Sequence, residues 1–359
     1  MALLKIGGSQ YSYLLGADGS VIDDVWIYRL EEARYWIVVN AANNDKDWAW
    51  VNAVREHRVA IDAQRPWTRA LGAETVEIRD MRDPARGSET GNYTACARAQ
   101  LALQGPRSRD VLLALIAPSP VATGEVGRGS LPVATGEEIL AMARNDIIHG
   151  RLAGHDLYIG RTGYTGEPMA FEIFVHPAAA PALWHALLAI GARFGLQPIG
   201  LAARDSLRIE AGLPLYGHEL AGPLNLNPAD AGFAPYVKLY KPFFIGKAAY
   251  MAHELVRKAR LARFRVDEEH VAMIGQGDVV VNRKGKVIGA VTSCSIDTAG
   301  RLTGLAYVQE PHHLRDTRLG VYRLGSRNWG SQSLEDLKPG DRLELPEDIT
   351  VIERFLNKK

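Results

Sequence analysis

The sequence predicts an α+β protein whose C-terminal part is a separate antiparallel β domain. Within residues 1–260, short strand-like apolar runs are mixed with amphipathic helical stretches, which is typical of helices that cover one face of a sheet. From residue 261 onward, short alternating runs are separated by turn signals such as residues 282–286. We therefore expect two domains, residues 1–260 and 261–359, which agrees with the length of the chain.

The composition narrows the possible classes of protein. The formal net charge of +1 gives no reason to expect nucleic acid or another polyanion as a partner. The two cysteines, Cys96 and Cys294, lack metal-type spacing and fit core thiols in a reducing compartment. Residues 1–6 are too short and too weakly basic for a targeting signal, and no apolar run reaches the ~20 residues of a membrane span. We expect a soluble cytoplasmic protein.

Residues 21–30 place two adjacent carboxylates in a run of β-branched and aromatic side chains. Successive strand residues point to opposite faces, so Asp23 and Asp24 cannot both face the same way. If Asp24 shares a face with Trp26 and Tyr28, its charge lies among large apolar groups, where it requires a partner or a ligand. The alternative is an ordinary aspartate at a strand edge after the turn at residues 19–20.

The rest of the N-terminal half is expected to alternate strands and helices. Asn44 is expected to cap a helix with Asp47 three residues on, and Ser108 to cap a second helix. The first helix should bury a stripe of Trp48, Val51 and Val54. The remaining expected elements are strands at 35–39, 76–81 and 97–103, helices at 109–115 and 137–145, and a surface loop at 117–136.

A glycine-rich loop follows the strand that begins at residue 156, and its glycines allow positive φ or a close approach of the backbone to a ligand. It matches no phosphate-binding fingerprint. Beyond it, Glu172 lies on a strand and faces either solvent or a pocket. Further helices are expected at 182–194, 201–211 and 246–260, the second with a charged face of Arg204, Asp205, Arg208 and Glu210, and the third with Tyr250 and Leu255 inward.

Eight motifs follow one another over nearly the whole chain. They are Gln10-Tyr11-Ser12, residues 19–24, 39–43, 103–106, 161–167 and 200–217, Asn227-Pro228, and residues 244–247. With the β-rich tail that contains residues 289–293, and in this order, they resemble the glycine-cleavage T-protein family, the tetrahydrofolate-dependent aminomethyltransferases.

The resemblance implies a folate-binding core of interleaved ferredoxin-like sublobes followed by an antiparallel β-barrel. It makes Asp24 the residue essential to turnover, and Glu172 the carboxylate that accepts hydrogen bonds from the adjacent N–H and amino donors of the pterin. The remaining implied folate-site residues are Tyr11, Asn40, Tyr164 and Arg204.

The chain departs from the family pattern at several points. The family's opening segment precedes Gln10 and is missing from this sequence, so we expect either a truncated reading or a member that lacks part of the core. One extra residue between Tyr164 and Glu172 would shift Glu172 or be absorbed as a bulge. Tyr236 and Arg144 stand where the family commonly has tryptophan and tyrosine, and the segments 117–136 and 326–337 resemble insertions.

The family reaction moves the aminomethyl carbon from the lipoyl arm of a carrier, the H-protein of the glycine cleavage system, to tetrahydrofolate and releases ammonia. Asp24 would stabilise developing positive charge or accept a proton, and no histidine has the spacing of a metal site or a position to relay a proton. Two alternatives remain: a tetrahydrofolate-dependent demethylase with another methyl donor, and a non-catalytic folate-binding protein of iron–sulfur assembly. The presence of Asp24 and the absence of a cysteine beside Tyr164 argue against the second.

Overall fold

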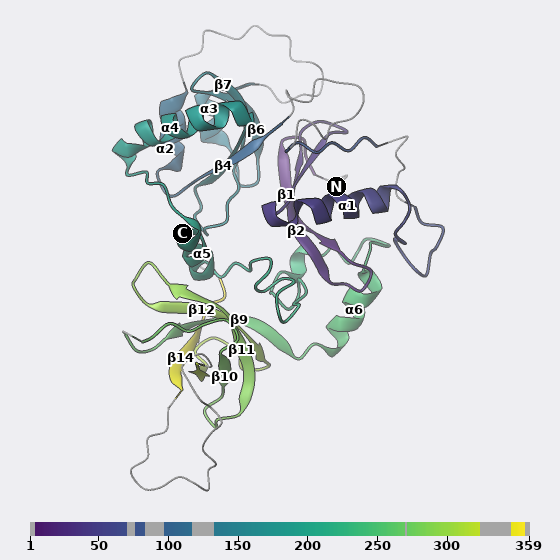
Figure 1. Cartoon of the computed structure of the whole chain (residues 1–359), viewed down its shortest axis with the longest axis vertical. Helices are drawn as coiled ribbons and strands as arrows, with labels where there is room; N and C mark the ends of the chain where they lie inside the picture. The colour runs from purple at the N-terminus through teal and green to yellow at the C-terminus, as the bar shows by residue number, and fades with distance from the viewer. Residues whose placement is uncertain are drawn as a thin grey trace.

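The computed structural model of the protein describes residues 4–69, 76–82, 97–116, 133–269, 271–323 and 346–355. Two sheets with their helices form one end of the molecule, and a closed barrel forms the other (Figure 1). The expected α+β class with a C-terminal antiparallel barrel is confirmed.

The first sheet contains three antiparallel strands in the order β1 (Gly8–Leu15), β2 (Val21–Arg29) and β3 (Tyr35–Val38). A 3₁₀ turn, η1 (Ala41–Asn43), leads into helix α1 (Asn44–Arg55). The β-branched and aromatic content of β1 and β2 favours this pleated pairing.

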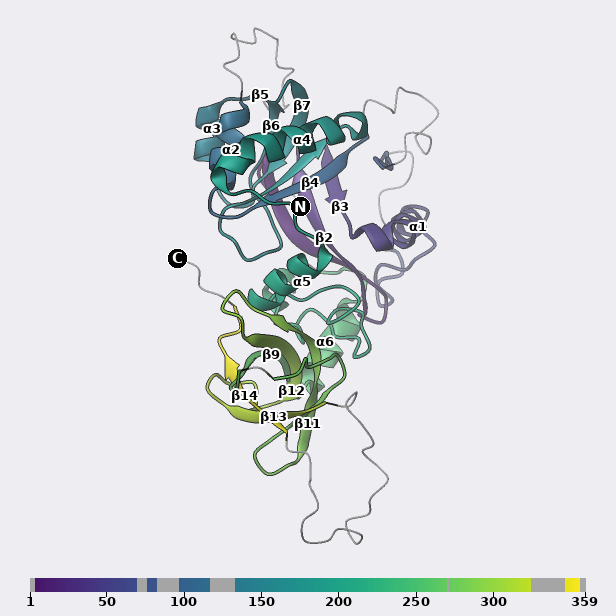
Figure 2. The same ribbon diagram turned by 60° about the vertical axis from the view of Figure 1, so that its left-hand side comes forward.

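The second sheet has five strands and carries its helices on one side. Helices α2 (Ser108–Leu115) and α4 (Ala180–Gly191) contribute Val111, Leu112 and Leu183 to a core that they share with the sheet (Figure 2). Helix α3 (Gly136–Ala141) is capped by Thr135 and Glu138, which satisfy each other's backbone N–H groups. The strand order is β4 (Ala99–Gln104), β8 (Ala170–Val175), β7 (His155–Gly160), β6 (Ile147–Leu152) and β5 (Val133–Ala134).

The two sheets meet through aromatic side chains and a short backbone junction. Tyr28 and Trp36 of the first sheet pack against Ile147 and Phe174 of the second. At the edge, the Ile147 N–H donates to the carbonyl of Gly7 at 2.8 Å. The face of β2 that carries Tyr28 is therefore held against the second sheet.

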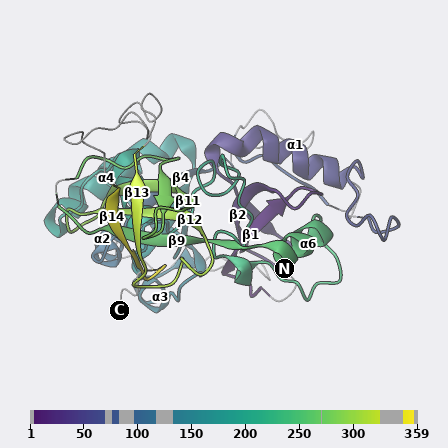
Figure 3. The ribbon, with the colours of Figure 1, turned by 90° about the horizontal axis from the view of Figure 1, so that it is seen from below.

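Helix α5 (Leu201–Glu210) lies between the sheets and the barrel and packs on β11 and β12 (Figure 2). Helix α6 (Lys247–Val256) leads into the barrel and lies on the same side of the molecule as α1, β1 and β2 (Figure 3). The barrel closes in the order β10 (Val279–Val281), β11 (Val287–Ile296), β12 (Leu302–Gln309), β9 (Ala259–Val266), β14 (Glu347–Ile352) and β13 (Arg318–Tyr322).

Several expected elements differ from the structure. Residues 76–81 form no strand, and α1 and α2 begin at Asn44 and Ser108 without a side-chain cap. Helix α6 ends at Val256, and Leu255 is 88% exposed. Because Leu255 lies five residues after the buried Tyr250, it points about 140° away from it around the helix.

Other expectations fall partly outside the described residues. This applies to Cys96, to residues 117–132 and to the whole segment 326–337. Cys294 packs beside the barrel core as expected, and burial raises the pKa of its thiol to about 12. The domain boundary at residue 260 stays a prediction, and β9 begins at Ala259. In the part of the chain that the structure describes, no helix is both long and apolar enough to cross a membrane.

Candidate active site

Asp24 lies on an aromatic face of the first sheet. The alternation of β2 puts Asp24, Trp26 and Tyr28 on one face, and the register with β1 places Tyr13 opposite Asp24 and Tyr11 opposite Trp26. The Tyr11 ring contacts those of Tyr13 and Trp26, with centroids 5.1 and 5.8 Å apart. The hypothesis that Asp24 shares a strand face with large aromatic side chains is therefore confirmed. The alternative of a strand-edge aspartate in a turn is wrong.

Two neutral donors hold the half-buried carboxylate of Asp24. The Tyr11 hydroxyl donates to Oδ2 at 2.8 Å, and the Asn40 side-chain amide donates to Oδ1 at 2.9 Å. Burial raises the pKa of Asp24, while the hydrogen bond from Tyr11 opposes this effect. The structure thus brings three of the six predicted site residues into one hydrogen-bonded group.

Asp23 points to the opposite face and is completely buried. Its Oδ2 accepts from the backbone N–H of Asn40 at 2.9 Å, and its Oδ1 accepts from the side-chain amides of Asn40 at 2.9 Å and Asn43 at 2.6 Å. The two adjacent aspartates therefore have different surroundings: Asp23 ties β2 to the turn before α1, and Asp24 faces the aromatic side chains.

Glu172 lies beside the far end of the same face. Its Oε2 accepts from the hydroxyls of Tyr28, at 2.9 Å, and Thr162, and its Oε1 accepts from the exposed Gln100 amide at 2.7 Å. β8 pairs with β4 in register from Ala170 onward, so the extra residue counted before Glu172 lies in the loop and forms no bulge.

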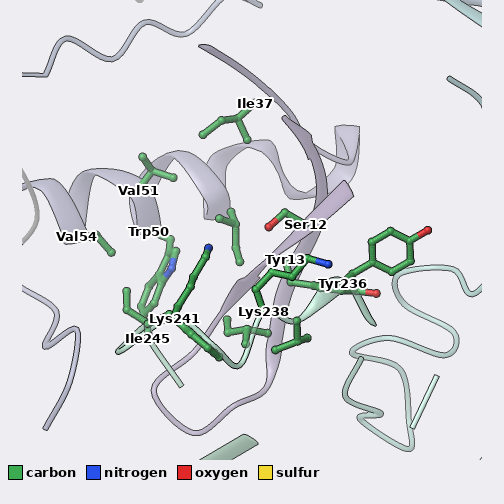
Figure 4. Close-up of a pocket in the computed structure, with 14 residues that line it drawn as sticks. Ser12, Tyr13, Ile37, Trp50, Val51, Val54, Tyr236, Lys238, Lys241 and Ile245 are labelled. Carbon is green, nitrogen blue, oxygen red and sulfur yellow. The ribbon is translucent and has the colours of Figure 1, made fainter. Parts of the chain in front are cut away.

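A cavity of about 350 Å³ adjoins the aromatic face. Tyr13 and Tyr236 line it, and both also neighbour Tyr11, whose ring centroid lies 5.0 Å from that of Tyr236. Trp50 and Val51 of α1 line the opposite side, with Lys238 and Lys241 nearby (Figure 4). The Tyr13 hydroxyl is buried and has no hydrogen-bond partner among the described residues. A polar group of a ligand could satisfy it.

The glycine-rich loop is held against the protein itself. Gly166 adopts φ +75°, and a Cβ there would lie 2.5 Å from that of Ala211. A Cβ on Gly163 would meet the side chains of Ala170 and Gln104. Gln104 accepts from Tyr164 N at 3.2 Å and from the Thr165 hydroxyl at 2.7 Å. These glycines permit close packing of the loop on the second sheet and α5.

Tyr164 and Arg204 form a second predicted group. The Arg204 guanidinium lies over the Tyr164 ring at 5.1 Å from its centroid, and the Tyr164 hydroxyl donates to the carbonyl of Pro214. Burial raises the pKa of Tyr164, Arg208 opposes that effect, and the charge of Asp24 adds to it. Tyr164 and Arg204 share no hydrogen bond with Asp24 in the part of the chain that the structure describes.

The charged face expected on α5 is partly wrong, because Arg208 is completely buried. Arg208 donates through Nη1 to Glu219 at 2.9 Å and through Nη2 to Ser293 of the barrel at 2.9 Å. Glu219, also 0% exposed, accepts from the Ser293 hydroxyl at 2.6 Å and from Leu215 N at 2.9 Å. This network joins α5 to the barrel beside Tyr164.

Sequence reasoning missed several contacts of the site. Tyr28 connects β2 to Glu172, and Phe233 contacts the Tyr11 ring at 5.7 Å. Phe355, at the C-terminal end of the described chain, contacts Phe233. The period of two in residues 21–30 placed Tyr28 on the face of Asp24 but not beside Glu172, and nothing in the local sequence relates Phe233 or Phe355 to β1.

A carboxylate on an aromatic sheet face beside a cavity has the composition of a small-molecule site, which combines an apolar, aromatic lining with a few placed polar groups. Residues 1–241 match the GCVT N-terminal domain family. The chain belongs to this family, and the resemblance that the eight motifs indicated is confirmed.

Similar proteins extend the comparison beyond residue 241. The chain is 37% identical over 323 residues to an aminomethyltransferase of Symbiobacterium thermophilum, covering 89% of this chain and 73% of that protein. It is 35% identical to an aminomethyltransferase of Streptomyces avermitilis, covering 87% and 71%. The crystal structure of glycine cleavage system aminomethyltransferase T from Bartonella henselae superposes with a TM-score of 0.66 at 24% identity, covering 98% and 76%, and shares the fold.

Proposed function

We propose that this chain is a tetrahydrofolate-dependent aminomethyltransferase of glycine cleavage. It takes the aminomethyl carbon from the lipoylated carrier, the H-protein, and releases ammonia. The observation that carries the proposal is the Asp24 carboxylate, held by Tyr11 and Asn40 on an aromatic sheet face with a cavity beside it. Membership of a family whose similar proteins are named aminomethyltransferases supports the same function.

The residues present fit a reduced pterin. The rings of Tyr11 and Trp26, neither of them fully buried, form an apolar surface on which a flat ring system can lie. Each oxygen of Asp24 accepts one hydrogen bond and retains capacity for another. Glu172 already accepts three hydrogen bonds, two of them at Oε2, so a pterin would displace the exposed Gln100 amide to reach Oε1.

Tetrahydrofolate, when bound, supplies the nitrogen atoms that receive the one-carbon unit. Asp24 then acts through its charge, because a carboxylate aligned by two neutral donors stabilises positive charge that develops on the transferred carbon. Tyr11 and Asn40 fix the direction of that carboxylate before the reactants arrive, which lowers the cost of alignment. Arg204 of α5 lies over the Tyr164 ring, and we assign this pair to the folate site on the family resemblance.

The aminomethyl donor and the cellular location belong to this proposal. The carrier brings the carbon on a lipoyl arm, an apolar chain that suits a cavity lined by Tyr13, Trp50 and Val51. The two cysteines without metal-type spacing support a reducing compartment such as the cytoplasm.

Two measurements, made one after the other, test the proposed function. Tetrahydrofolate is titrated while tryptophan fluorescence is recorded, and Trp26→Phe serves as the control, because Trp26 lies on the proposed binding face. No binding at about millimolar concentration would overturn the proposal. Ammonia release from an aminomethylated lipoyl carrier then identifies the donor, and methyl transfer from another donor in place of this release would favour a demethylase.

Glu172→Gln should raise the dissociation constant for tetrahydrofolate by about tenfold or more, because a hydrogen bond to a charged group contributes about 1.5–3 kcal/mol. The substitution also replaces one carboxylate oxygen of residue 172, an acceptor for the Tyr28 and Thr162 hydroxyls, by an NH₂ group, which is a donor. Asp156→Asn, on the exposed surface of the same sheet, is the matched control and should leave the constant unchanged. Equal affinity of the Glu172 variant and wild type would remove Glu172 from the folate site.

A further inference from the structure

Asp47 is a buried carboxylate that receives no hydrogen bond from the described part of the chain. It lies in the first turn of α1, is 2% exposed, and neither oxygen accepts a hydrogen bond from the residues that the structure describes. A buried polar group without a partner is costly, and a charged one is more so. The sequence assigned Asp47 to a capping box, which it does not form.

The charged groups that face Asp47 come from two elements. From β2, Asp23 lies within hydrogen-bonding reach of Asp47, and Asp24 lies farther along the same strand. From α1 itself, Lys46 lies next to Asp47 in the chain, but its ammonium group donates to the carbonyl of Ile22 and to the Tyr216 hydroxyl. Asp47 therefore faces a carboxylate at close range and is paired with no cation among the residues that the structure describes.

Two ionised carboxylates accept hydrogen bonds and cannot donate to each other, but one proton between them forms a strong hydrogen bond. Burial, together with Asp23, raises the pKa of Asp47 to about 8. Asp23 already accepts three hydrogen bonds, from the backbone and side-chain amides of Asn40 and from Asn43, so Asp47 is the carboxyl left to carry the proton.

We propose that Asp47 is a positioning residue: it keeps a proton in the Asp47–Asp23 pair and so holds the Asn40 amide on Asp24. The inference rests on the proposed function for its effect on turnover.

The connection to the site runs through one amide group. Asn40 Nδ2 lies 2.9 Å from Asp23 Oδ1 and 2.9 Å from Asp24 Oδ1, so the two aspartates share its donors. Loss of the proton to solvent leaves two negative charges behind Asn40. Those charges attract the amide away from Asp24 and also make ionisation of Asp24 less favourable. Turnover should therefore decrease as Asp47 ionises.

The same proton affects stability in a defined direction. In the folded protein Asp47 keeps its proton up to about pH 8, whereas in the unfolded chain it loses the proton near its ordinary value of 3.8. The folded state therefore binds one more proton between these values, and its stability contribution is lost as pH rises through this range.

Asp47→Asn tests the proposal because it keeps the shape and a permanent donor toward Asp23. In wild type, kcat for aminomethyl transfer should fall above about pH 8, and in Asp47→Asn this falling limb should move up by about one pH unit or more. At pH 7 the two values should agree within roughly threefold. Asp45→Asn, an exposed aspartate two residues earlier in the same turn, is the matched control and should keep the wild-type profile.

Two readouts do not depend on turnover. Infrared difference spectra of wild type should show one protonated carboxyl that ionises between about pH 7 and 9, and Asp47→Asn should lack it. The melting temperature of Asp47→Asn should exceed that of wild type at pH 9 by about 2 °C or more. A wild-type spectrum without this carboxyl, whether or not the variant folds, or an unshifted falling limb in a folded variant, would overturn the inference. Absence of aminomethyl transfer with the infrared signal present would overturn the proposed function alone.

Discussion

Asp24→Asn is expected to reduce kcat for aminomethyl transfer by about 10³-fold, because it removes the charge that stabilises the transferred carbon. The dissociation constant for tetrahydrofolate should change by less than about tenfold, since one charge-assisted contact is altered. Asparagine has the same shape and can still pair with Tyr11 and Asn40, so the fold should persist.

The measurement combines single-turnover kinetics with a folate titration. Tyr11→Phe is a second variant with a smaller expected effect. It removes one hydrogen bond to Oδ2 of Asp24 and leaves the charge of Asp24 in place, so kcat should fall by about tenfold. Asp45→Asn removes an exposed charge nearby and should behave as wild type. Wild-type turnover in Asp24→Asn would contradict the role of Asp24, and a parallel loss of folate binding would show that it binds rather than acts in the reaction.

Glu219→Ala is expected to lower the free energy of unfolding by about 3–5 kcal/mol, the usual cost of breaking a buried ion pair by removing one partner. Arg208 would lose its buried partner, and Ser293 and Leu215 N would lose their acceptor. Because Ser293 belongs to the barrel, the change should also weaken the contact between α5 and the barrel.

Chemical denaturation of Glu219→Ala, with two comparison variants, measures this effect. Asp205→Ala removes the other, 38% exposed partner of Arg208 and should cost about 1 kcal/mol or less. Glu219→Gln keeps the shape and separates the effect of charge from that of packing. Equal costs for Glu219→Ala and Asp205→Ala would show that the buried pair contributes no more than a surface pair.

Local pattern predicted the elements whose signals were strong. The alternation of residues 21–30, the run at 35–39 and the regularly spaced strands after residue 260 all became strands, because side-chain period and β-branched content act over a few residues. Residues 76–81 alternate equally well but form no strand, so alternation alone did not decide the outcome there.

The sequence likewise predicted some residues of the candidate site correctly and misinterpreted others. The sequence identified Asp24, Tyr11 and Asn40, which the structure joins directly, and it placed Asp24 on the aromatic face through the period of two. It interpreted Asp47 as a cap and Arg208 as a surface charge. Both are buried by elements distant in sequence, β2 for Asp47 and the barrel for Arg208.

By itself, the sequence of this protein determined the fold class, the family and the identity of the candidate catalytic carboxylate, because these depend on period, composition and motif order. The tertiary structure decided which charges are buried and what they face. Tyr28 meets Glu172, Asp23 meets Asp47, and Arg208 meets Glu219 only after separate elements pack. The energetics of an ionisable group depend on burial and on neighbours across the fold, and local pattern specifies neither.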